Sequence, residues 1–179
     1  MKAETDTERI FSVDCQIPVS QQYQSLAPDR IIQEDTRNHI SFNVMPDRPV
    51  EETLFIKEYR IWPNYMETVF DRQYKSSMIH SPDHLIFLSL LVTCQKSMYV
   101  YVCNALGIPY GPRDPERVKI WPIDVKVVLP KMVRTKNNLV HSIRFSPLRK
   151  VDEGKYHVAI QSHVEGIIQL DGEALIFLI

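Results

Sequence analysis

The sequence lacks a strong excess of charge of either sign. Its formal net charge is −1 at pH 7, from 21 basic and 22 acidic side chains, and it contains no block of like charge. Proteins that bind nucleic acid usually present a strongly basic surface to the phosphates. We therefore expect no nucleic-acid partner.

The sequence also lacks a long apolar run, and we expect no secretory signal. The first residues, MKAETDTERIF, mix acids and bases without an apolar segment. The most apolar run, residues 85–92, contains Ser89 and is followed by Thr93, Gln95 and Lys96. It is therefore shorter than the roughly 20 residues that a bilayer requires. We expect no membrane contact.

Cysteine is scarce as well. Cys15, Cys94 and Cys103 show no metal-type spacing, and an odd number does not favour a disulfide framework. We expect a reducing cytoplasm, no cofactor and no metal. Cys94 lies in an apolar stretch, which predicts a buried and inert thiol.

Three histidines occur on separate predicted strands, and no spacing rule places them together. They would form a metal site only if strand pairing aligned them: His141, His157 and His163.

What the chain does contain is a composition typical of one globular domain. Of its 179 residues, 44% are hydrophobic and 24% are charged, which is enough for one real core. Residues 1–38 are polar with brief apolar clusters, and we interpret them as an N-terminal arm. Residues 39–179 are predicted to form the domain.

One long helix dominates the pattern, from Ser81 to Gly107. Ser81 suits the N-cap, Pro82 the first helical position and Asp83 the positive end of the helix dipole. Gly107 followed by Pro109 predicts the end. About 25 residues would span roughly 37 Å, enough to cross a small domain. Its first half is apolar all round and is predicted to be buried.

Strands are predicted on both sides of this helix. The segment 119–129 shows the clearest alternation of period two. The pattern of residues 64–79 fits a helix or a strand, and both interpretations stay open. The other predicted strands are 39–45, 53–62, 139–145, 155–164 and 166–179. The last strands form an antiparallel meander.

This order of elements, with three local features, resembles the hot-dog superfamily of thioesterases and dehydratases. The features are Gln95 within the helix, the step Gly107-Ile108-Pro109 at its end, and the segment 123–145. The resemblance extends over residues 53–179. It is greatest to hot-dog domains of the A-factor-biosynthesis type or to long-chain acyl-CoA thioesterases. It implies an α+β hot-dog fold, in which a curved antiparallel sheet wraps a long central helix.

The resemblance also implies a function. Hot-dog enzymes act on acyl groups joined through sulfur to coenzyme A or an acyl carrier protein. We expect a thioesterase, dehydratase or related acyl-transfer enzyme acting on fatty acyl or polyketide thioesters, in fatty acid or secondary metabolite biosynthesis. The expected assembly is a homodimer or a dimer of dimers.

Candidate catalytic residues cluster at the start of the helix, where free N–H groups can hold a developing oxyanion. His80 and His84 would act as general base or as hydrogen-bond donor to the carbonyl, because imidazole titrates near neutral pH. Asp83 would activate water or orient an imidazole. The alternatives are helix capping or exposed loop histidines, and for Asp83 the helix dipole alone.

Candidate substrate-binding residues are Gln95, Tyr65 and Ser89. Gln95 could equally be a satisfied structural amide, and tyrosines are often core residues. Ser89, Thr93 and Ser97 recur every four residues as a small polar stripe. The stripe either lets a strand approach closely or lines the path of a pantetheine arm.

One departure from the superfamily favours a second hypothesis. Its dehydratases and many of its thioesterases carry an Asp or Glu about one turn before the glutamine, but this chain has Leu90, Leu91 and Val92 there. A non-catalytic module that binds acyl thioesters or a carrier protein is therefore the alternative. A third hypothesis, a cone-shaped pocket of the ketosteroid-isomerase type, is disfavoured by the early strand at 39–45.

Overall fold

The computed structural model describes residues 26–35, 39–45, 50–76, 87–110, 117–128, 137–165 and 168–179. Within these ranges the chain forms one helix and nine strands of a single sheet. In chain order the elements are β1 (Arg30–Gln33), β2 (His39–Met45), β3 (Val50–Trp62), β4 (Tyr65–Ser76), α2 (Phe87–Ala105), β5 (Val118–Val128), β6 (Leu139–Phe145), β7 (Arg149–Asp152), β8 (Lys155–Val164) and β9 (Ile168–Leu178).

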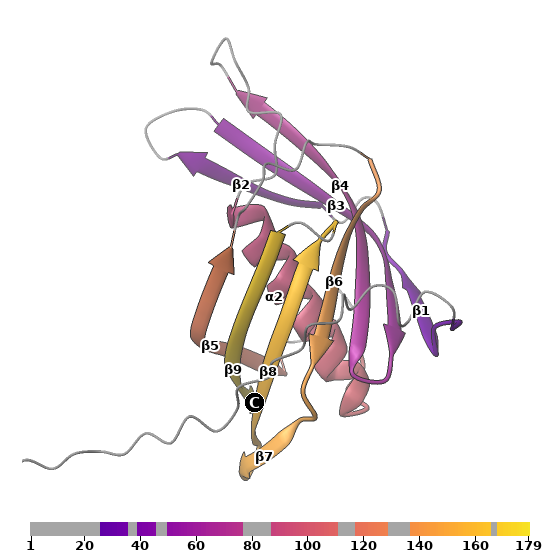
Figure 1. Ribbon diagram of the computed structural model, residues 1–179, viewed down its shortest axis with the longest axis vertical. Helices are drawn as coiled ribbons and strands as arrows, with labels where there is room; N and C mark the ends of the chain where they lie inside the picture. Colours follow the sequence, from indigo (N-terminus) through magenta and orange to yellow (C-terminus); the bar gives the residue numbers. More distant parts are fainter. Residues whose placement is uncertain are drawn as a thin grey trace, which may run out of the picture.

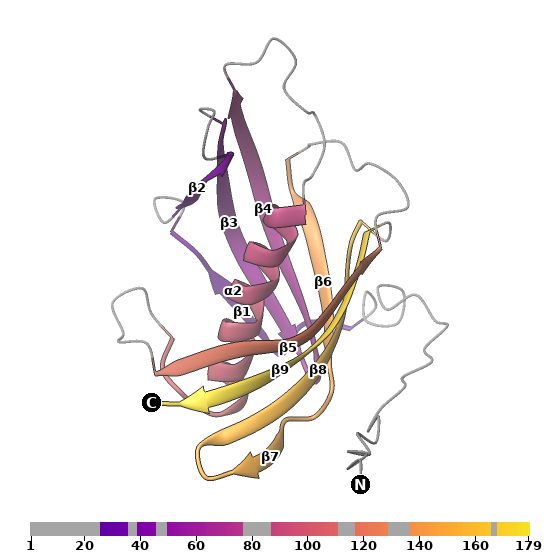
Figure 2. The same cartoon turned by 90° about the vertical axis from the view of Figure 1, so that its left-hand side faces the viewer.

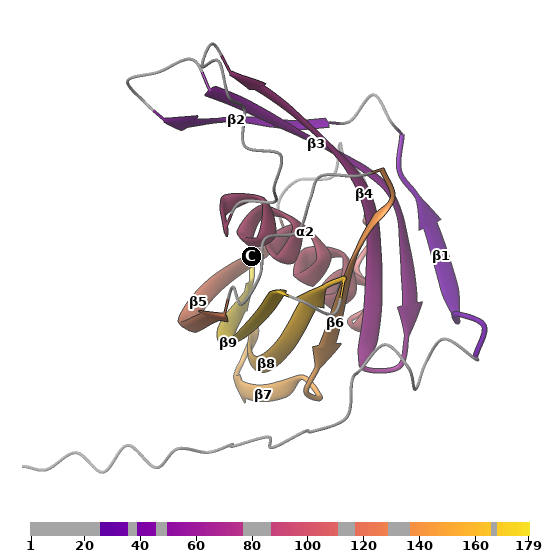
Figure 3. The ribbon, with the colours of Figure 1, turned by 45° about the horizontal axis from the view of Figure 1, so that its top comes forward.

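The sheet is antiparallel throughout and curves around α2. Its order is β1-β3-β4-β6-β8-β9-β5, with β2 also paired to β3 and β7 paired to β8. Figure 1 and Figure 3 show α2 held on the concave side, between the β2–β3–β4 end and the β5 end. Figure 2 shows α2 running alongside β3 and β4. The predicted arrangement, one helix wrapped by a curved antiparallel sheet, is confirmed at this level.

The structure tests the prediction for one end of the helix only. Its C-terminal end is confirmed, because Gly107 has a φ of 66° and the N–H of Ile108 donates to the carbonyl of Cys103 at 2.8 Å. Glycine adopts this left-handed conformation without a Cβ clash. At the other end, α2 begins at Phe87, and the signals at residues 81–83 lie outside the described residues. No helix in the described ranges is long and apolar enough to cross a membrane.

Within the segment that fits a helix or a strand, residues 64–79, the structure has the strand β4 at Tyr65–Ser76, and residues 77–79 lie outside the described residues. It pairs with β3 from Trp62↔Tyr65 to Val50↔Ser76, around a hairpin turn in which Asn64 has a φ of 56°. All residues from Tyr65 to Phe70 are buried, and Met66, Thr68 and Phe70 share the face toward α2. The helical spacing in the sequence was incidental, because strand pairing on both sides stabilises the extended form.

Two short strands were not predicted. β1 and β7 are four residues each and are exposed along nearly their whole length. Neither has an apolar alternation that a sequence pattern could reveal. β1 belongs to the segment interpreted as an arm, and it pairs with β3 at one edge of the sheet.

The core lies between α2 and the concave face of the sheet. Its fully buried apolar residues come from the central strands and the helix: Leu54, Met66, Phe70, Val100, Val102, Leu139, Ile143, Val158 and Ile176. The edge strand β5 contributes little, because Trp121, Ile123 and Val125 remain 69%, 54% and 41% exposed. The clearest alternation in the sequence therefore marks the least buried long strand.

Candidate functional site

The polar stripe of α2 faces the sheet. Ser89, Thr93 and Ser97 are each fully buried. The Ser97 hydroxyl donates to the carbonyl of Thr93 at 2.7 Å and lies 2.6 Å from the hydroxyl of Thr68 on β4. The other two hydroxyls also contact polar partners on the sheet. The stripe therefore allows close approach of the sheet, and each of its hydroxyls is satisfied.

At the N-terminal turn of α2 the partner is a buried ion pair. Arg72 of β4 holds Glu52 of β3 with two hydrogen bonds, Nε to Oε1 at 2.6 Å and Nη2 to Oε2 at 3.1 Å. Both side chains are 0% exposed. The Ser89 hydroxyl donates to Oε1 of the same carboxylate. Both oxygens of Glu52 are therefore engaged.

Burial of these charges requires such pairing, because an unpaired ion in the interior costs several kcal/mol. The cross-strand register places Arg72 opposite Leu54, two residues from Glu52 on the same face. Glu52 is thus stabilised by Arg72 and by Ser89.

One turn further along α2 the partner is a buried histidine. The Thr93 hydroxyl lies 2.9 Å from Nδ1 of His141 on β6, and Ser162 Oγ of β8 lies 3.1 Å from Nε2. Because Ser162 donates to the carbonyl of Leu170 at 3.2 Å, it accepts from Nε2–H. Burial lowers the pKa of His141 from 6.5 to about 3, with a further contribution from His163. The imidazole is therefore neutral and joins the helix to two strands.

The opposite side of α2 is open and mostly apolar. Leu91, Val92 and Tyr99 are half-buried there, whereas Gln95 and Lys96 are exposed. Gln95 therefore needs no protein partner, and it faces away from the polar stripe. The prediction that the first half of the helix is buried holds only for the side that faces the sheet.

Aromatic rings gather near the C-terminal end of α2. Tyr110 lies edge-on to Tyr59 at 6.3 Å and tilted against Tyr99 at 5.9 Å between ring centroids. The Tyr110 hydroxyl donates to Glu34. Burial raises the pKa of both Tyr59 and Tyr110 above the ordinary value of 10. These phenols stay protonated. Tyr110 connects Glu34, in the segment after β1, to Tyr99 of the helix.

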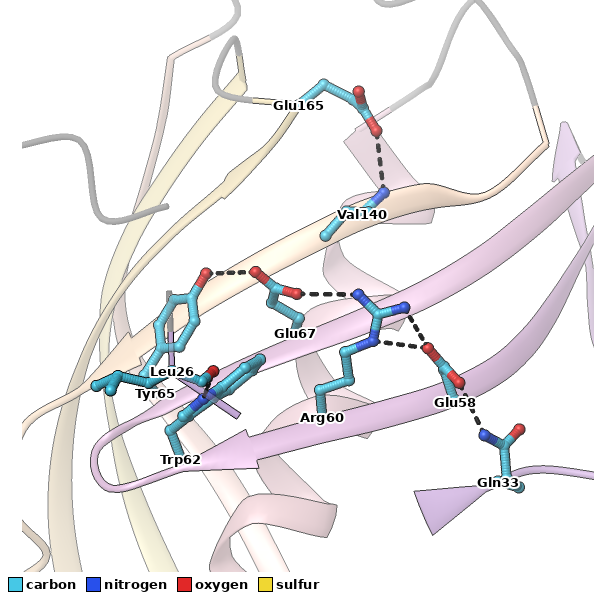
Figure 4. A network of polar contacts seen from close by, with 9 residues as sticks. All are labelled: Leu26, Gln33, Glu58, Arg60, Trp62, Tyr65, Glu67, Val140 and Glu165. Atoms are coloured by element: carbon cyan, nitrogen blue, oxygen red, sulfur yellow. Dashed lines mark hydrogen bonds and ion pairs between the residues drawn. The ribbon is translucent and has the colours of Figure 1, made fainter. Parts of the chain in front are cut away.

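A second polar network lies on the convex face of the sheet (Figure 4). The Tyr65 hydroxyl donates to Glu67 at 2.8 Å, and Arg60 bridges Glu67 at 3.5 Å to Glu58 at 2.5 Å. Gln33 of β1 donates to Glu58 at 2.8 Å. Burial opposes ionisation of Glu58, but the hydrogen bonds from Gln33 and Arg60 outweigh it and lower its pKa. This network connects β1, β3 and β4.

The three predicted catalytic residues, His80, Asp83 and His84, lie outside the described residues. The first residue of α2 in the described ranges is Phe87. Their roles stay predictions.

The three predicted substrate-binding residues are described, and they are not brought together. Ser89 is buried against Glu52, and Gln95 is on the open side of α2. Tyr65 is one residue from Met66, which packs into the core, so its side chain is on the convex face. Their contacts with a substrate stay predictions.

Pattern reasoning missed Glu52 and Arg72. The available signal was their position in the two-residue period of each strand. Glu52 lies on the same face of β3 as the buried Leu54, and Arg72 lies on the same face of β4 as the buried Phe70. An acid and a base at core positions of neighbouring strands indicate a buried pair.

The strands do not align the histidines for metal binding. His141 is buried against α2, whereas His157 pairs with Glu173 at 3.1 Å and His163 is half-buried. No group of three metal-ligating side chains occurs in the described ranges. Cys94 is buried, as predicted, and burial raises the pKa of its thiol to about 12, which disfavours the reactive thiolate.

Comparisons with known proteins give structural similarities only. The sequence matches no protein-family profile and no curated protein. A mutant of the thioesterase PA1618 from Pseudomonas aeruginosa is similar with a TM-score of 0.42 and 9% identity, over 69% of this chain and 82% of that chain. A homologue of HP0420 from Helicobacter felis has a TM-score of 0.38 and 11% identity, over 68% of this chain and 76% of that chain. Both TM-scores are below 0.5, and the fold of this chain is defined by its own strand order and pairing.

Proposed function

We propose that this chain is an enzyme of the hot-dog superfamily that acts on acyl thioesters, by hydrolysis, dehydration or a related acyl transfer. The observation that carries the proposal is the position of α2. It lies between β4 and β5 in sequence and on the concave face of strands ordered β4-β6-β8-β9-β5 in space. That is the arrangement which the resemblance of residues 53–179 implies.

The proposed substrate is a fatty acyl or polyketide group on coenzyme A or an acyl carrier protein. Its acyl chain would lie beside α2, where the half-buried Leu91, Val92 and Tyr99 present apolar surface. The proposed catalytic groups are His80, Asp83 and His84, which precede Phe87 in the sequence. A histidine and a carboxylate suit proton transfer to and from water or the leaving thiol.

Turnover of a panel of acyl-CoA and acyl-carrier-protein substrates tests the proposal. Thiol release reports hydrolysis, and loss of water detected by mass spectrometry reports dehydration. We expect His80→Ala with Asp83→Ala to abolish turnover while the melting temperature is retained. The matched control, His157→Ala with Glu173→Ala, removes the same two chemical groups from a pair on β8 and β9. Equal turnover by the first variant and the wild type would refute these catalytic residues.

A non-catalytic acyl-thioester or carrier-protein module is the alternative, and the composition of α2 favours it. The helix has no Asp or Glu between Phe87 and Ala105. Calorimetric binding of an acyl-CoA, without any product, would support this function over catalysis.

The proposal includes a homodimer formed through β5. This 11-residue strand ends the sheet, and its outer edge has no partner strand among the described residues. Trp121 and Ile123 are exposed on it. An unpaired, apolar edge strand readily pairs with another chain. We expect a dimer by sedimentation velocity and a monomer after Trp121→Glu with Ile123→Glu; a monomeric wild type would exclude this assembly.

A further inference from the structure

The buried ion pair of Glu52 and Arg72 contacts α2 at its N-terminal turn. Ser89, the third residue of the helix, donates to the Glu52 carboxylate, and Arg72 fixes that carboxylate through two hydrogen bonds. The pair therefore connects β3 and β4 to the end of α2 that follows the proposed catalytic residues in the sequence.

Stability alone gives no reason for charges at this place. The surroundings are apolar, since Leu54 and Phe70 are 0% exposed and Leu90 is 1% exposed. Replacing a buried ion pair by apolar residues of similar volume is often neutral or stabilising. A bidentate pair does supply direction, because its hydrogen bonds require a defined orientation of both groups.

Direct participation of Glu52 in chemistry does not fit its environment. Its side chain is 0% exposed, and both oxygens accept hydrogen bonds from Arg72 while one also accepts from Ser89. A general base must reach the proton that it removes. Glu52 can therefore act only through the helix that it contacts.

A second restraint acts on the same turn. The Thr93 hydroxyl lies 2.9 Å from the Ser89 carbonyl oxygen and 2.9 Å from Nδ1 of His141, which as the unprotonated ring nitrogen accepts the hydroxyl proton. The N-terminal part of α2 is thus held from β3 and β4 through Glu52 and Arg72, and from β6 through His141.

We infer that Glu52 and Arg72 are positioning residues, which orient the N-terminal turn of α2 for the reaction proposed above. This inference rests on the proposed function and gives the buried pair a role in positioning, not in proton transfer. Loss of the pair would tilt or shift the turn without removing a group that contacts the substrate. Displacements of about 1 Å can lower turnover by about 100-fold.

The test uses the full chain with Glu52→Leu and Arg72→Met together, which removes both charges and keeps the volume. We expect a melting temperature near that of the wild type, a kcat lower by about 10- to 100-fold, and a nearly unchanged KM. The pH profile of kcat keeps its shape, because Glu52 is not the base. Wild-type kcat in this folded variant would overturn the inference and leave the proposed function standing.

Ser89→Ala provides the second variant, in case the double variant does not fold. It removes the one hydroxyl that joins the pair to α2, and we expect a lower kcat with an unchanged KM. Thr68→Val is the matched control, because it removes another buried hydroxyl between helix and sheet, two turns away at Ser97. Equal kcat for these two variants, or loss of one limb of the pH profile in the double variant, contradicts a positioning role. A wild type without turnover of any acyl thioester overturns the proposed function and the inference with it.

Discussion

The two halves of α2 contact the sheet by different means. In the first half, Ser89 and Thr93 contact Glu52 and His141 through hydrogen bonds. In the second half the contacts are mainly apolar, and the ring of Tyr101 stacks on Phe145 at 3.7 Å with an interplanar angle of 3°. The other buried apolar residues of this half are Met98, Val100, Val102 and Cys103, and the polar Ser97 is buried there as well.

This difference separates stabilisation from orientation. Apolar burial is favourable in many orientations, because the hydrophobic effect has no direction. Hydrogen bonds between buried polar groups are favourable in few orientations, and they cost free energy when a partner is missing. The second half of α2 therefore contributes stability, and the first half contributes a defined position.

Breaking the ion pair on one side should give the largest change in this comparison. Arg72→Met leaves Glu52 buried without its cation, and we expect a loss of about 3–5 kcal/mol in the free energy of unfolding. Urea denaturation followed by circular dichroism measures this loss. The control is the double variant Glu52→Leu with Arg72→Met, which should be far less destabilised. A single variant as stable as the double one would show that the pair carries no such penalty.

Acid should weaken the first half of the helix through His141. Its pKa is lowered from 6.5 to about 3, so between these values only the unfolded chain binds the proton. Stability is complete above pH 6.5 and falls by about 1.4 kcal/mol per pH unit on acidification, about 2 kcal/mol by pH 5.

Denaturation of the wild type and of His141→Gln at several pH values isolates this contribution. His163 titrates in the same direction, since burial lowers its pKa while Glu67 opposes the shift. The difference between the two proteins removes the part due to His163. If the free energy of unfolding of the two proteins changes with pH in the same way, the result would contradict a neutral, buried His141.

The second half should respond to loss of one aromatic contact. Tyr101→Leu removes the stack on Phe145 and a hydrogen bond of 3.1 Å to Asn64. We expect a loss of about 1–2 kcal/mol, because an aromatic pair adds about 0.5–1.5 kcal/mol beyond its buried area. A double-mutant cycle with Phe145→Leu measures the coupling. If the free-energy losses of the two single variants simply add in the double variant, the stacking contact contributes no stability.

Thr68→Val should give the smallest change and sharpen the comparison. Val has a similar shape, and Ser97 keeps its hydrogen bond to the Thr93 carbonyl. We expect a loss of about 1 kcal/mol, the usual net value of one hydrogen bond. Thermal unfolding measures it. A loss as large as that of Arg72→Met would mean that all contacts of the stripe are equally critical.

Much of the fold was accessible from the sequence. The boundaries of β2, β6 and β8 agree with the predicted strands, because period-two alternation reflects one buried face. The C-terminal end of α2 could be predicted from Gly107, because glycine readily adopts the positive φ that ends a helix. β1 and β7 were not, because exposed four-residue strands leave no apolar pattern.

The polar contacts of the site were less accessible. Ser89, Thr93 and Ser97 stood out as a stripe, but their partners did not. Glu52 and Arg72 are 20 residues apart, and only the β3–β4 register brings them together. Gln95 was chosen as a polar group on an apolar helix, but it is exposed.

By itself, the sequence determined the helix, its end at Gly107 and most strands, since these depend on neighbours within a few residues. Only the tertiary structure decided which side of α2 meets the sheet. Side chains with small hydroxyls allow a closer approach of the sheet than leucine does. They face the sheet because Glu52, His141 and Thr68 are there to form hydrogen bonds with them. Hydrogen bonds between distant strands and a helix depend on strand register, which no local pattern specifies.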